Sequence, residues 1–192
     1  RSQGHIRKFP RKNTWLDLMD LKADFPMALT EKPILVTGGS GLIGSALIAK
    51  LNDLGREDII VTDLLGSDQR WKNLVPLRFL DYLEADQLIS VLESRRLNEV
   101  GTVFHLGACS ATTETDASYL ISNNFEYTRF LAEWALKGNR RFVYASSAAT
   151  YGDGTQGMED GEADLEKHRP LNMYGYSKHL FDLHAKKKGW FD

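Results

Sequence analysis

A tyrosine and a lysine four residues apart, Tyr174 and Lys178, form the pair best suited to acid–base chemistry. On a helix this spacing places both side chains on one face, whereas Tyr176 points elsewhere. A free tyrosine titrates near pH ~10 and is a poor base at neutral pH, but a neighbouring cation favours its phenolate. A surface helix with a lysine stem lying on a ring is the alternative, and the pair alone does not exclude it.

Gly38, Gly41 and Gly44 form a second candidate site within the run VTGGSGLIGS. The run follows an apolar segment and precedes a helical pattern. In this context a glycine turn brings backbone N–H groups and a helix N-terminus up to a pyrophosphate. Asp63 ends the next apolar run, where a carboxylate accepts ribose hydroxyls. An ordinary strand-to-helix turn is the alternative, but the glycines and Asp63 together favour nucleotide binding.

The sequence leaves NAD and NADP both open as the cofactor. Asp63 favours NAD, because a carboxylate repels a 2′-phosphate. Arg70 and Lys72 follow in LLGSDQRWKN and lie within reach of such a phosphate.

Apolar runs alternate with helical patterns along the chain. The short β-rich runs predict buried parallel strands, and the amphipathic segments predict helices that cover them. Right-handed crossovers then give an α/β Rossmann-type doubly wound sheet, with its ligand at the carboxyl ends of the strands. The predicted strands are 34–37, 59–63, 77–80, 102–106 and 141–146, and the predicted helices are 42–55, 84–96, 116–137 and 174–188.

The composition of the 192 residues bounds the class of protein. A net charge of −2 gives no sign of a nucleic-acid partner, and no apolar run approaches the ~18 residues of a membrane span. The single cysteine, Cys109, excludes an internal disulfide and predicts a reducing compartment, the cytoplasm. Residues 1–26 are expected to be an appendage of unknown role. Residues 27–192 are expected to form an NAD(P)-binding domain that stops before the last strands and the substrate domain.

Three motifs, in this order, resemble the extended short-chain dehydrogenase/reductase family: the glycine turn, YASSAATYG at 144–152 and Tyr174-x-x-x-Lys178. Within that family, the runs 104–116 and 170–182 are most similar to the branch that epimerises ADP-heptose for lipopolysaccharide. The resemblance implies a nucleotide-sugar epimerase that oxidises its sugar transiently with tightly bound NAD or NADP and reduces it from the other face. Another epimerase or dehydratase of the family and a catalytically silent NAD(P)-binding fragment are the alternatives.

The resemblance also implies residue roles. Tyr174 would be the acid/base, Lys178 would favour its phenolate and bind the nicotinamide ribose, and Ser147 would hydrogen-bond the reacting sugar oxygen. The cofactor-binding residues expected from the turn and the resemblance are Gly38, Gly41, Leu42, Ile43, Gly44, Asp63, Leu64, Arg70, Leu106, Gly107, Ala108, Cys109, Ser110, Asn123 and Lys178.

The chain departs from the family pattern in places. Leu64 and Leu106 stand where family members often have Asn and Glu, and Ala85 stands where a lysine often lies near a 2′-phosphate, which weakens the case for NADP. The second catalytic base of the family would lie beyond residue 192, so the chain alone is expected to be inactive. Family members commonly pair through the helices that begin near Asp116 and Tyr174, which predicts a homo-oligomer.

The remaining candidates are given structural roles. Cys109 is expected to be a small residue packed against the cofactor, and His105 is expected to be a structural histidine. Asp116 could contact substrate or cap the helix that follows it. No metal site is expected, because the other histidines of the 27–192 domain have no metal-ligand spacing with a cysteine.

Overall fold

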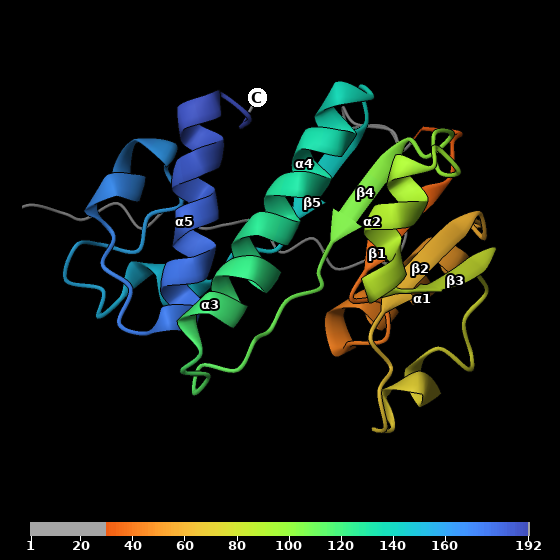
Figure 1. Ribbon diagram of the computed structural model, residues 1–192, viewed down its shortest axis with the longest axis horizontal. Helices are drawn as coiled ribbons and strands as arrows, with labels where there is room; N and C mark the ends of the chain where they lie inside the picture. Colours follow the sequence, from red (N-terminus) through yellow and green to blue (C-terminus); the bar gives the residue numbers. More distant parts are fainter. Residues whose placement is uncertain (1–29, 192) are drawn as a thin grey trace, which may run out of the picture.

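One parallel sheet with helices on both faces makes up the described part of the chain, residues 30–191 of the computed structural model (Figure 1). Its strand order is β3-β2-β1-β4-β5, so the chain crosses back over β1 between β3 and β4. The predicted Rossmann-type fold is confirmed, and the crossover puts a ligand crevice at the carboxyl ends of β1 and β4. The strands are β1 (Ile34–Thr37), β2 (Ile59–Asp63), β3 (Asp81–Glu84), β4 (Thr102–His105) and β5 (Arg141–Tyr144).

Helices and short helical turns connect the strands. The π-helical segment η3 joins α3 directly to α4, so the three form one continuous rod beside the sheet (Figure 1). The helical elements are α1 (Leu42–Asp53), η2 (Arg70–Asn73), α2 (Ala85–Glu93), α3 (Ala117–Leu120), η3 (Ile121–Glu126), α4 (Tyr127–Lys137), η4 (Ala148–Tyr151), η5 (Glu162–Lys167) and α5 (Met173–Lys188).

The core lies on both faces of the sheet, because successive strand side chains point to opposite sides and both sides are covered. On one face Leu35 and Ile60 pack with residues of α2 and α4. On the other face Ile34 and Val36 pack with residues of α1. Phe181 of α5 forms a third cluster against α4, and α5 lies beside α4 at the β5 end of the sheet (Figure 1).

The predicted strand at 77–80 is wrong, since β3 begins only at Asp81. The buried Asn52 at the end of α1 explains the difference. Its Nδ2 donates to the carbonyl of Arg78 and its Oδ1 accepts from the N–H of Arg78, both at 2.8 Å. Because one side chain binds both backbone polar groups of Arg78, this residue cannot pair with β2, and pairing starts only with the N–H of Leu80, which donates to the Ile59 carbonyl at 2.8 Å.

The predicted helix boundaries hold with small changes. Asp116 does not begin its helix but caps it, accepting a hydrogen bond from the N–H of Tyr119 at 2.9 Å. The helix predicted at 84–96 ends at Glu93, and Arg95 then adopts a positive φ of 64°. Gly55, predicted as the end of the first helix, follows α1 with a φ of +79°.

The sequence also led to predictions about residues 1–26 and about membrane spans. The proposed appendage, residues 1–26, lies outside the described residues. Within residues 30–191, no helix combines the length and the apolar character needed to cross a membrane.

We expect Asn52→Ala to lower the free energy of unfolding by about 2 kcal/mol, because it removes the partly buried hydrogen bonds between the Asn52 side chain and the backbone of Arg78. Chemical denaturation measures this loss. Gln87→Ala, an exposed change on α2, is the control and should change stability by less than about 0.5 kcal/mol. Equal effects of the two changes would contradict the role given to Asn52.

Candidate functional site

Two of the three motif glycines are required by the fold itself. Gly38 has a φ of +70°, and a Cβ there would lie 2.5 Å from the backbone nitrogen of Gly107. A Cβ on Gly44 would lie 2.2 Å from the carbonyl oxygen of Gly38. Only glycine therefore lets the loops after β1 and β4 close on each other and lets α1 pack on the turn.

Gly41 is different, because the protein leaves space beside it. A Cβ there would meet only the Gly38 carbonyl oxygen, at 3.3 Å, and the φ of −70° suits any residue. Gly41 starts α1 without a side-chain cap, and the exposed Leu42 and Ile43 follow. The N–H groups and the positive end of the helix dipole therefore face outward, as an anion site requires.

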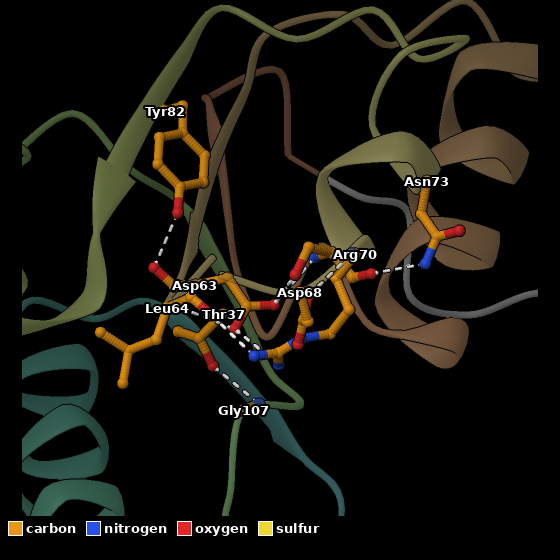
Figure 2. A network of polar contacts seen from close by, with 9 residues as sticks. Thr37, Asp63, Leu64, Asp68, Arg70, Asn73, Tyr82 and Gly107 are labelled. Carbon is orange, nitrogen blue, oxygen red and sulfur yellow. Dashed lines mark hydrogen bonds and ion pairs between the residues drawn. The ribbon is translucent and has the colours of Figure 1, made fainter. Parts of the chain in front are cut away.

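Asp63 is held in place at the carboxyl end of β2. The backbone N–H and the hydroxyl of the buried Ser40 donate to its Oδ2, at 2.9 and 2.6 Å. The N–H of Leu64 donates to its Oδ1 at 2.8 Å, and the hydroxyl of Tyr82 donates to its carbonyl (Figure 2). These contacts fix a carboxylate beside the turn, where it can accept hydrogen bonds from the hydroxyl groups of a ligand.

Arg70 lies at the same end of the site (Figure 2). Its Nη1 is 3.9 Å from Asp63 Oδ1, while its Nε pairs with Asp68 at 2.5 Å and its Nη2 donates to the Leu64 carbonyl at 2.9 Å. An acceptor and a cation therefore lie side by side. This arrangement keeps both NAD and NADP compatible with the site.

A cleft of about 450 Å³ runs from Asp63 past Gly38 to the loop after β4. Two buried hydroxyls in its wall, Thr62 Oγ1 and Tyr127 Oη, have no hydrogen-bond partner within the described residues. Burial raises the pKa of Tyr127 well above its usual value, so its hydroxyl stays protonated. Unpartnered hydroxyls, the glycine turn and the fixed carboxylate together fit a polar ligand such as a dinucleotide.

The sequence identified part of the wall of this cleft. The predicted residues that line it are Gly38, Asp63, Leu64, Arg70, Gly107, Ala108, Cys109 and Asn123. The lining residues that were not predicted to bind the cofactor are Thr37, Thr62, Ala85, Asp86, Ile89, Tyr119 and Tyr127. The predicted residues outside the lining are Gly41, Leu42, Ile43, Gly44, Leu106, Ser110 and Lys178.

A buried chain of hydrogen bonds connects β1 to η3 behind the cleft. Thr128 donates its hydroxyl to the Asn124 carbonyl at 2.6 Å, so its oxygen must accept from His105 Nε2, 2.8 Å away. His105 Nδ1 then accepts from Thr37 Oγ1 at 2.6 Å, and this oxygen accepts from the Gly107 N–H at 3.1 Å. Burial lowers the pKa of His105 to about 3, which keeps it neutral. The predicted structural role of His105 is confirmed.

Asn124 is an organising residue that the sequence analysis missed in favour of its neighbour Asn123. Its Oδ1 accepts from the Cys109 N–H and its Nδ2 donates to the Cys109 carbonyl, both at 2.9 Å. The same Nδ2 also donates to Ser177 Oγ at 3.0 Å, which ties the cleft loop to α5. In the structure Asn124 is a buried amide in a π-helical segment, a feature often found at functional sites, and no sequence signal separated it from Asn123.

The helix α5 carries the tyrosine–lysine pair in the predicted register. Asn172 caps it, because its side chain accepts from the Gly175 N–H at 2.7 Å. Tyr174 therefore lies in the first turn and is half-buried, while Tyr176 is 46% exposed. A Cβ on Gly175 would lie 2.6 Å from the Ala149 carbonyl oxygen, so this glycine seats α5 directly on η4. The turn η4 begins one residue after Ser147.

Lys178 is almost fully buried, with 3% of its surface exposed. Its ammonium donates to the Ala145 carbonyl at 2.9 Å, just beyond the end of β5. Burial lowers its pKa from 10.5 to about 8, and the charge of Asp182 opposes part of this shift. Ser147 is half-buried and caps η4 by accepting from the Ala149 N–H at 3.2 Å. The fold thus brings Lys178 and Ser147 to the same end of β5.

Comparison with known proteins gives a consistent family match. The model of the NAD dependent epimerase/dehydratase family matches residues 34–188. An ADP-L-glycero-D-manno-heptose-6-epimerase of Nitratidesulfovibrio vulgaris is 51% identical over 159 residues, covering 82% of this chain and 49% of the relative. The chain spans about half the length of the curated relatives it matches.

Solved structures agree with this match. The Helicobacter pylori ADP-L-glycero-D-manno-heptose-6-epimerase has 27% identity and a TM-score of 0.68, covering 82% of this chain and 51% of that chain. A UDP-glucuronic acid 4-epimerase from Bacillus cereus, solved in complex with NAD, has 26% identity and a TM-score of 0.67, covering 82% and 52%.

We expect Gly41→Val to abolish dinucleotide binding while the protein stays folded, because only a ligand needs the space beside Gly41. Gly44→Val should instead destabilise the fold, since its side chain would meet the turn backbone. Calorimetric titration with NAD and NADP, beside thermal melts, separates the two effects. Unchanged affinity in folded Gly41→Val would contradict the anion site.

The buried Lys178 predicts a pH-dependent stability. Its pKa is lower in the folded protein than in the unfolded chain, so the folded state loses its proton first. Below about pH 8 the burial penalty is fully present, and it is relieved as the pH rises towards 10.5. The stability of the wild-type protein relative to Lys178→Met should therefore rise by up to about 3 kcal/mol across this window. Urea denaturation at several pH values measures the difference in free energy of unfolding between the two proteins. A difference that does not change with pH would contradict the lowered pKa of Lys178.

Proposed function

The chain belongs to the NAD dependent epimerase/dehydratase family, and we propose that it binds NAD or NADP and takes part in epimerising a nucleotide sugar, ADP-L-glycero-D-manno-heptose, at C6. The observation that supports this proposal is the seating of α5 on η4, with the buried Lys178 bound where β5 ends and Tyr174 one turn before it on the same helix. The names of the relatives supply the choice of sugar.

The dinucleotide would lie along the cleft. The N–H groups that follow Gly41 would bind its pyrophosphate, and Asp63 would accept the hydroxyls of the adenosine ribose. The unpartnered hydroxyls of Tyr127 and Thr62 would form hydrogen bonds with the ligand. A dinucleotide held there would supply reversible hydride transfer at the reacting carbon.

Tyr174 would exchange the proton of the sugar hydroxyl. Tyr174 lies in the first turn of α5 and Lys178 lies one turn further along the same helix, so both belong to the end of α5 that faces the proposed sugar site. The Ser147 hydroxyl would donate to the sugar oxygen as negative charge develops there. The remaining N–H groups of Lys178, beyond the one bound to Ala145, would bind the nicotinamide ribose.

We further propose that residues 27–192 form the dinucleotide-binding domain of a homo-oligomeric enzyme of the cytoplasm. The helix α4 belongs to the segment after Asp116 that was expected to take part in pairing, and two of its aromatic side chains pack partly on the core. Phe130 and Trp134 lie against the cluster around Leu131, so any interface would use their outer edges. Sedimentation measures the oligomeric state.

The test of function uses a chimera, because epimerisation at both faces of one carbon needs a second acid/base group opposite Tyr174. Residues 34–188 replace the matching segment of the 51% identical relative. We expect Tyr174→Phe to lower epimerisation of ADP-heptose by ~10²–10⁴-fold with dinucleotide affinity nearly intact. Tyr176→Phe is the matched control and should have little effect.

Separation of the two C6 epimers, beside dinucleotide titrations, measures these outcomes. Loss of activity with Tyr176→Phe but not with Tyr174→Phe would overturn the catalytic assignment. A chimera that binds dinucleotide but never turns over would favour a silent NAD(P)-binding domain.

A further inference from the structure

A second buried charge lies one helical turn beyond Lys178. Asp182 is only 3% exposed, and both of its carboxylate oxygens accept hydrogen bonds from the end of β5. The hydroxyl of Tyr144 donates to Oδ1, and the hydroxyl of Ser146 donates to Oδ2 at 2.7 Å. A buried carboxylate is costly unless it is paired or hydrogen-bonded, and neither hydroxyl carries a charge. Lys178, one turn back on α5, is a cation on which the charge of Asp182 acts.

Asp182 and Lys178 both hydrogen-bond the short segment 144–146 at the end of β5. Lys178 binds the carbonyl of Ala145, while Asp182 binds the side chains of Tyr144 and Ser146 on either side of it. The next residue is Ser147. The pair therefore holds three consecutive residues that lead directly to Ser147, without forming an ion pair within 4.0 Å.

The other titratable groups nearby do not supply a competing charge. His105 of β4 faces Lys178 but is neutral, because burial lowers its pKa to about 3. Burial, and then Asp182, raise the pKa of Tyr144, so this group also stays neutral. His179 of α5 is 4% exposed, and burial lowers its pKa. Among the described residues, Asp182 is the anion that acts on Lys178.

We propose that Asp182 is a positioning residue of this site: it keeps Lys178 in its ammonium form and holds the end of β5 that carries Ser147. The catalytic meaning of the role rests on the proposed function, but the charge coupling does not. Asp182 does not need to touch substrate or cofactor. It acts through Lys178 by charge and through Tyr144 and Ser146 by hydrogen bonds.

The direct test is the titration of Lys178 in the ligand-free chain. ¹³C-labelled lysine gives one NMR signal for each side chain, and Lys178→Arg identifies the signal of interest. Asp182→Asn keeps the size of the side chain and removes its charge, and the two hydroxyls can rotate to suit the amide. We expect the midpoint of Lys178 to fall by about one pH unit in Asp182→Asn. Asp53→Asn, an exposed change on α1, should leave it unchanged.

Two further variants separate charge from structure. Tyr144→Phe and Ser146→Ala each remove one hydrogen bond and leave the carboxylate in place, so we expect lower melting temperatures with an unchanged Lys178 midpoint. A purely structural Asp182 would lower the melting temperature of Asp182→Asn without moving the midpoint. That result would overturn the proposal.

A double-mutant cycle covers the case in which Asp182→Asn does not fold. Removing Asp182 leaves a buried ammonium uncompensated, whereas the variant Lys178→Met/Asp182→Asn buries neither charge. We expect Asp182→Asn to lower the melting temperature several degrees more with Lys178 present than in the Lys178→Met background. Equal losses in both backgrounds, or failure of both to fold, would overturn the coupling.

In the chimera, Asp182→Asn should move the alkaline limb of the activity profile to lower pH. If the NMR midpoint and the cycle behave as expected but the chimera shows no turnover at all, the proposed function fails and the charge coupling stands.

Discussion

The buried hydrogen-bond chain that starts at Thr37 is the interaction on which the rest of the site depends. It passes from β1 through His105 of β4 and Thr128 of α4 to Asn124 in the π-helical segment. The Asn124 side chain then binds the loop after β4 and Ser177 of α5. One set of directional contacts therefore sets the spacing between the cleft and the helix that carries the tyrosine–lysine pair. Every proton in it has one consistent donor and acceptor, because His105 is neutral.

The sequence predicted the parts of this molecule that depend on neighbouring residues. The first two strands match their predicted bounds, and the helical register of Tyr174 and Lys178 follows from spacing alone. Asp63 could be placed because it ends a strand beside the glycine turn. Local pattern is sufficient in each case, since the fold class determines where the carboxyl end of a strand must lie.

The features that the sequence did not predict depend on contacts between distant segments. The Asn52 side chain hydrogen-bonds the backbone N–H and carbonyl of Arg78, 26 residues away, so β3 begins later in the chain than predicted. Asn124, rather than Asn123, hydrogen-bonds Ser177 of α5, and only the tertiary packing distinguishes these adjacent asparagines. Asp182 likewise looks like an ordinary polar position on an amphipathic helix until its burial is known. Each is a polar residue that the fold buries, and burial of a single polar residue cannot be read from local pattern.

The contrast among the three motif glycines bears on how such motifs change over evolutionary time. At Gly38 and Gly44 a side chain would clash with the backbone of the protein itself. Selection for folding would therefore preserve these two glycines whether or not a ligand is bound. At Gly41 a Cβ would meet only the Gly38 carbonyl oxygen, at 3.3 Å, so under the proposed function the ligand would be the main reason for a glycine there. A lineage that abandoned its cofactor would be free to drift at position 41 while keeping glycine at 38 and 44. Under the proposed function, the residue at position 41 would therefore report whether a lineage still binds its cofactor, whereas the glycines at positions 38 and 44 would not.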